Sequence, residues 1–204
     1  MSEAAAKADL LRYLQEARDA LLWKLDGLSE YEIRRPRTPT GTNLLGLVKH
    51  VSAVEIGYFG DTFGRPFEDS VPHWMAPDAE LNADMWAAAD ESRADIEALY
   101  RRAWAHSNAT IGELPLDTVG RVPWWNPENA EVTLHHIVVR VLADTQRHAG
   151  HADILRELQD GSAGWLPGKD ALATSDPDWW AAYRDRVEAA ARQAEENDTG
   201  GAPQ

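Results

Sequence analysis

Apolar residues recur every three or four positions along most of this chain, which is the spacing of amphipathic helices. The pattern predicts helices over residues 4–26, 43–62, 81–106 and 127–160, and a shorter helix over 178–196. The alternating pattern of strands is nearly absent, and no internal repeat of about 20–50 residues is visible. The sequence therefore predicts an all-α fold, an antiparallel four-helix bundle with long loops and a short extra C-terminal helix.

Capping residues and glycines indicate where these helices end and how far the domain extends. Thr42 is a suitable N-cap for the second helix, and Asn126, which precedes a proline, is a suitable N-cap for the fourth. Gly161 is a suitable stop for the fourth helix. We therefore expect a bundle over residues 1–165, followed by an extension over 166–204 that carries the short helix and a frayed tail.

Acidic residues outnumber basic ones in this chain of 204 residues. There are 20 Lys and Arg against 34 Asp and Glu, a formal net charge of -14. Such a charge repels nucleic acid and anionic membrane surfaces, so we expect neither as a partner. The N-terminal residues show no basic patch followed by an apolar run, and we therefore expect no signal peptide and a cytoplasmic protein.

Cysteine is absent from the sequence. Its absence excludes disulfides, cysteine-ligated metal sites and a cysteine nucleophile. Any thiol chemistry therefore needs a thiol from outside the chain, and histidine is the residue type left to consider for a site.

Three ionisable residues share one face of the predicted fourth helix. Asp144, His148 and His151 are spaced by four and three residues, so at about 100° per residue they fall within an arc of roughly 60°. Val141 and Leu155 lie on the same face, which therefore points toward the bundle interior. Burying ionisable groups there lowers the stability of the fold unless their charge is neutralised or they coordinate an ion. A divalent cation in the bundle interior would neutralise and coordinate all three.

His50 on the predicted second helix is a candidate to complete such a site. Gly46 and Gly57 leave space beside its imidazole, as a metal or cofactor pocket requires, although close helix packing requires the same residues. Two interpretations stay open at this point. One is a metal site; in the other, Asp144 and His148 pair across one helical turn and His50 is an ordinary, partly buried histidine.

Two stretches of the chain resemble the DinB-like superfamily, and within it the actinobacterial mycothiol-transferase-like branch, which is related to mycothiol-dependent maleylpyruvate isomerase. The first stretch is TGTNLLGLVKH over residues 40–50, followed by Val54 and Glu55. The second is DTQRHAGHADILRE over residues 144–157. The similarity covers about residues 5 to 165.

The resemblance implies a four-helix bundle with a divalent metal, zinc or nickel, and makes His50, Asp144 and His148 the ligands. Many members have Glu or His where this chain has Asp144. Several members have glutamine at the position of His151, which implies that His151 lies beside the ligands or faces the substrate.

Three protein ligands leave at least one position on the metal open, as in catalytic zinc sites. A thiol bound there has a lowered pKa, so that thiolate is available at neutral pH. We therefore expect a metal-dependent enzyme that uses a low-molecular-weight thiol such as mycothiol in S-transfer or isomerisation of a small electrophilic substrate. His151 is the candidate catalytic residue that moves a proton.

We expect the substrate to bind beneath two loops, one with Trp74 and one with Trp124 and Trp125. Arg34 and Arg37, beside the start of the second helix, are candidates for binding a carboxylate or phosphate, unless they are simply solvated.

The alternative to an enzyme is a non-enzymatic bundle that binds a metal or a small molecule and has a stress-related role. Because dimerisation through helices is common in such bundles, a homodimer is the expected assembly.

Overall fold

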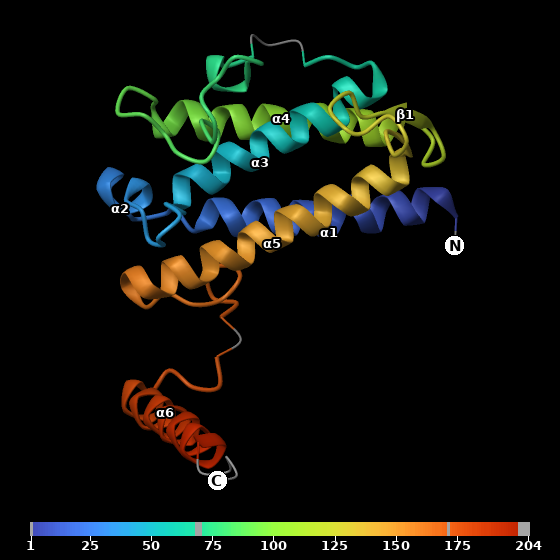
Figure 1. Cartoon of the computed structure of the whole chain (residues 1–204). Coiled ribbons are helices and arrows are strands. Elements are labelled where there is room, and N and C mark those ends of the chain that lie inside the picture. Colours follow the sequence, from blue (N-terminus) through green and yellow to red (C-terminus); the bar gives the residue numbers. More distant parts are fainter. Residues whose placement is uncertain (1, 68–70, 171, 200–204) are drawn as a thin grey trace. The chain divides into compact units, whose positions relative to one another are not determined.

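The computed structural model describes residues 2–67, 71–170 and 172–199 and is mostly helical (Figure 1). The predicted all-α bundle is confirmed. The helices are α1 (Glu3–Trp23), α2 (Glu30–Arg34), α3 (Leu44–Phe59), α4 (Arg93–Glu113), α5 (Leu134–Asp160) and α6 (Pro177–Thr199), with short 3-10 helices η1 (Asp61–Phe63) and η2 (His73–Met75). Strands β1 (Val119–Arg121) and β2 (Glu131–Thr133) form an antiparallel pair.

The helix directions differ in part from a fully antiparallel bundle. The hydroxyl of Thr110, late in α4, donates to the carbonyl of Phe59 at the end of α3, so these two helices run in the same direction. Lys24, just after α1, pairs with Asp153 in the second half of α5 at 2.7 Å, so α1 and α5 also run together. By contrast, α3 runs antiparallel to α5, and α1 runs antiparallel to α4 (Figure 1). The connection between α3 and α4 is long enough for α4 to begin at the end of the bundle where α3 begins, as the contacts of Lys49 with Trp86 and Glu91 show.

The predicted start of the third bundle helix is wrong. Residues 81–92 form turns, and α4 begins only after Ser92, whose hydroxyl accepts from the backbone N–H of Asp95. The apolar residues Met85 and Trp86, which suggested an earlier start, belong to this irregular segment.

The predicted start of the fourth helix is also wrong, whereas its end is confirmed. The N-cap is Thr133, whose hydroxyl accepts from the N–H of His136, because the residues just before it pair as strand β2. Asn126 lies in a turn before that strand. Gly161 ends α5 in the left-handed conformation at a φ of 77°. For α3 the N-cap is Asn43, one residue after the expected Thr42.

Helix α2 is an element that apolar periodicity did not predict. Ser29 and Glu32 form a capping box, in which the serine hydroxyl accepts from the N–H of Glu32 and the glutamate accepts from the N–H of Ser29. Ile33 is fully buried and anchors this short helix on the bundle.

The chain divides into two compact units, residues 1–169 and 170–204. The second unit contains α6, which at 23 residues is longer than expected. Its Trp179 and Tyr183 rings stack at 5.1 Å. Helix α6 includes the first residues of the expected frayed tail, and residues 200–204 lie outside the described part of the chain. No described helix combines the length and the apolar composition needed to cross a bilayer.

A buried ion pair connects three helices in the middle of the bundle. Arg18 on α1 and Glu55 on α3 are both 0% exposed and form two hydrogen bonds of 2.8 and 2.5 Å. Ser107 on α4 donates to the same carboxylate at 2.8 Å, and Asn108 accepts from the guanidinium at 2.9 Å. These contacts satisfy the buried charges, which is the condition for keeping such a pair in a core.

We predict that Arg18→Met lowers the free energy of unfolding by about 3–5 kcal/mol, because it leaves the buried Glu55 carboxylate unpaired. Chemical denaturation followed by circular dichroism measures the change. The matched control is Arg12→Met, which removes an arginine from ion pairs on the surface of the same helix and should leave stability unchanged within error. Equal effects of the two variants would contradict a special role for the buried pair.

Candidate metal centre

Helices α3 and α5 bring three of the sequence-predicted residues together. His50 comes from α3, and Asp144 and His148 come from α5. One potential ligand atom from each side chain lies within 4.8 Å of the others. The His50 and His148 rings meet edge to face with their centroids 4.8 Å apart. All three side chains are partly buried.

Two buried polar atoms of this cluster have no hydrogen-bond partner among the described residues. Asp144 Oδ2 and His148 Nδ1 are buried, and no described residue forms a hydrogen bond with either. His148 Nε2 is 3.6 Å from Asp144 Oδ2, which is too long for a hydrogen bond. Two ligand atoms about 2.0–2.1 Å from a tetrahedral zinc ion lie roughly 3.4 Å apart. The donor set and its spacing therefore fit a divalent cation better than a hydrogen-bonded pair across one turn.

Asp84 is a component of the site that the sequence analysis missed. Its Oδ2 lies 2.6 Å from His50 Nδ1. The hydrogen bond with His50 lowers the pKa of Asp84, so the carboxylate is ionised at neutral pH. An ionised carboxylate only accepts, so His50 donates to it from Nδ1, and in the neutral imidazole the Nε2 lone pair is then available to a metal. A carboxylate behind a histidine in this way orients many metal-bound imidazoles.

Contacts with α3 hold the segment that carries Asp84. The side-chain amide of Asn43 donates to the Met85 carbonyl at 3.1 Å, and Lys49 Nζ donates to the Trp86 carbonyl at 2.9 Å. A Cβ atom at Gly46 would lie 1.9 Å from the Met85 carbonyl oxygen. Glycine is therefore required at this position because the segment passes directly against the helix.

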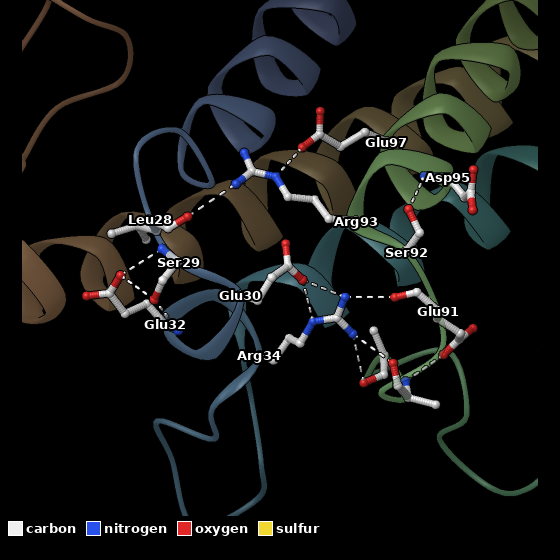
Figure 2. A network of polar contacts seen from close by, with 12 residues as sticks. Leu28, Ser29, Glu30, Glu32, Arg34, Glu91, Ser92, Arg93, Asp95 and Glu97 are labelled. Carbon is white, nitrogen blue, oxygen red and sulfur yellow. Dashed lines mark hydrogen bonds and ion pairs between the residues drawn. The ribbon is translucent and has the colours of Figure 1, made fainter.

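Arg34 on α2 also binds the segment that carries Asp84. Its guanidinium pairs with Glu30 and donates to the backbone carbonyls of Ala88 at 2.8 Å and Glu91 at 2.7 Å (Figure 2). Arg37 donates to the carbonyl of Leu158 near the end of α5. Neither arginine contacts the three candidate ligands, and their expected role in substrate binding stays a prediction.

Burial lowers the pKa of His148, and the neighbouring His50 lowers it further. His148 is therefore neutral at pH 7, the form that binds metals. His151 lies one turn further along α5, where it is exposed and its ring centroid is 5.6 Å from that of His148. The structure thus places His151 beside the cluster and open to solvent.

The predicted tryptophans have different surroundings. Trp74 packs over the buried Lys49, whose Nζ is 4.6 Å from the ring centroid. Trp124 and Trp125 contact Tyr58 on α3, with ring centroids 5.2 and 5.9 Å away. A Cβ at Gly57 would lie 2.9 Å from Trp124, so this glycine makes room for the indole.

The fold and this cluster define an all-α bundle with a partly buried His, Asp and His set that is suited to a cation. The family model of mycothiol S-transferases matches residues 9–161, most of the chain. The chain belongs to the mycothiol S-transferase family, as the resemblance of the two motifs led us to expect, and this links it to mycothiol-related S-transfer. No curated protein matches the chain.

We predict that Asp84→Ala removes the hydrogen bond that fixes the tautomer of His50, so that both tautomers become populated. Zinc binding should weaken about 10–100-fold, the range seen when a supporting partner of a ligand is lost. Nitrogen NMR of the metal-free protein reports the tautomer, and zinc titration reports the affinity. Asp90→Ala, an exposed carboxylate of the same segment, is the control. An unchanged His50 tautomer in Asp84→Ala would show that the carboxylate does not set it.

Proposed function

We propose that this protein is a metal-dependent thiol S-transferase or isomerase, in which His50, Asp144 and His148 hold zinc or nickel. The observation that carries the proposal is the meeting of three potential ligand atoms within 4.8 Å, two of whose side chains have a buried atom without a hydrogen bond from any described residue. The thiol is mycothiol or another low-molecular-weight thiol, which the family membership supports. The second substrate is a small electrophile.

The metal, when bound, supplies a lowered pKa for a thiol at its open position. The residues of the chain prepare and complete the reaction. Asp84 orients His50, and burial keeps His148 neutral. His151 accepts the thiol proton on its imidazole while a bond forms between the thiol sulfur and the electrophilic carbon of the substrate. In a transfer the leaving group departs with its electron pair; in an isomerisation the thiol is released again.

Residues 1–165 carry this activity in our proposal, and the family match over residues 9–161 supports that limit. A reduced low-molecular-weight thiol is available in the cytoplasm, where we place the protein. The homodimer and the absence of nucleic-acid partners stay predictions.

The competition between Asp144 and His151 for the place beside His148 yields one prediction. Asp144→Ala should weaken zinc binding by at least about tenfold, because it removes the anionic ligand. His151→Ala should keep the metal and impair thiol chemistry. Zinc titration of both variants decides between the residues. If His151→Ala loses the ion and Asp144→Ala keeps it, our assignment is wrong.

The second prediction concerns turnover. The zinc- or nickel-loaded protein, given mycothiol and a panel of small electrophiles, should form conjugates, and a chelator should abolish the reaction. Mass spectrometry detects the products, and the metal-free protein is the control. Metal and thiol binding without any turnover across the panel would instead support the non-enzymatic binding module.

A further inference from the structure

A shallow, open cavity of about 640 Å³ lies along α5 and is lined by residues of that helix. Asp144 lines it, so the cavity and the proposed site share a residue. Arg140, Arg147 and His136 also line it. The cavity is therefore basic, in a chain whose net charge is -14.

The two arginines of this cavity differ from most arginines of the bundle. Arg18, Arg93 and Arg156 each pair with a carboxylate. Within the described part of the chain, no carboxylate lies within ion-pair distance of Arg140 or Arg147. An acidic protein that leaves two guanidinium groups unpaired in one cavity concentrates positive potential there, which favours an anionic ligand.

Arg140 is held in place by neutral groups. Its Nε donates to the hydroxyl of Tyr58 at 3.1 Å, and its guanidinium carbon lies 4.8 Å from the ring centroid of Trp125. Trp125 Nε1 donates to the same hydroxyl at 3.2 Å. Among the described residues, none bonds to the two terminal nitrogens of Arg140. They form a fixed fork, the geometry that binds a carboxylate through two parallel hydrogen bonds.

The positions on α5 relate this fork to the metal centre. Arg140 precedes Asp144 by four residues, about 6 Å along the helix. Arg147 follows Asp144 by three residues, and at about 100° per residue all three fall within an arc of roughly 60°. Trp124 is 52% exposed and contacts Tyr58, so an apolar surface lies beside the fork.

We propose that Arg140 and Arg147 bind the carboxylate of the electrophilic substrate, which makes the substrates short organic acids with a planar apolar portion that packs on Trp124. The reacting carbon lies roughly one helical turn, about 6 Å, from the carboxylate. The electrophilic character of the ligand and the position of its reacting carbon rest on the proposed function, whereas the anion site does not, because it uses no metal ligand except as a neighbour.

Binding of 4-phenylbutyrate and of its uncharged amide to the full chain tests the proposal. Calorimetry and tryptophan fluorescence should show the carboxylate binding about tenfold or more tightly than the amide, since a hydrogen bond to a charged group is worth that much. Arg140→Gln should abolish this preference, and Arg140→Lys, which keeps the charge but not the fork, should restore only part of it. Arg121→Gln, an exposed arginine on β1, should leave it unchanged.

Three outcomes would overturn the proposal. The first is equal binding of the acid and the amide to the wild-type protein. The second is an equal loss of both in Arg140→Gln, which would mean that Arg140 only supports Trp125. The third is tighter binding of phenyl phosphate than of the carboxylate, which would change the ligand class.

Zinc titration of the same proteins separates this inference from the proposed function. Arg140→Gln should bind zinc as the wild-type protein does. If the wild-type protein binds no zinc but still prefers the carboxylate, the proposed function fails and the anion site stands. If zinc binds and the preference is absent, the anion site fails alone.

Discussion

The buried pair of Arg18 and Glu55 sets the rotation of α3, and the candidate site depends on that rotation. Glu55 follows His50 by five residues, which places the two side chains about 140° apart around the helix. When Glu55 points to α1 and α4, where Arg18 and Ser107 hold its carboxylate, His50 must point to α5. A shift of α3 by one residue would bury an unpaired carboxylate and turn His50 away from His148. The orientation of α3 that forms the core ion pair is thus the same orientation that brings His50 to His148.

The second support of the site is the irregular segment that carries Asp84. This segment has only turns and a few backbone hydrogen bonds of its own over residues 81–92, so side chains satisfy part of its backbone. Arg34 and Lys49 donate to its carbonyls, and both also pair with carboxylates. Arg34 and Lys49 therefore fix the position of the segment that carries Asp84, the partner of His50. Their contribution to the site is the position of Asp84.

Helical periodicity allowed the helical class of the fold and the shared face of Asp144 and His148 to be predicted, because it fixes which residues of one helix lie together. Periodicity left His50 on another helix as an open candidate, and the resemblance of the two motifs made it a ligand together with the other two residues. The same periodicity failed over residues 81–92, where apolar side chains pack in an irregular segment and imitate a helix. Asp84 was missed for this reason, since its partner lies 34 residues earlier and only the folded segment brings the two together. The parallel direction of α3 and α4 was missed because nothing in the sequence shows where a long connection leads.

The arginines show most clearly what a sequence leaves open. Arg34 at the end of α2 and Arg37 in the connection to α3 suggested anion binding, yet the folded chain directs both at backbone carbonyls. Arg140 lies within a regular helix and suggested nothing. Its Nε donates to the hydroxyl of Tyr58, a residue 82 positions away, and its guanidinium lies over the ring of Trp125 in the loop between β1 and β2. Whether an arginine presents its terminal nitrogens to a ligand depends on which groups bind the rest of the guanidinium, and those groups come from tertiary structure.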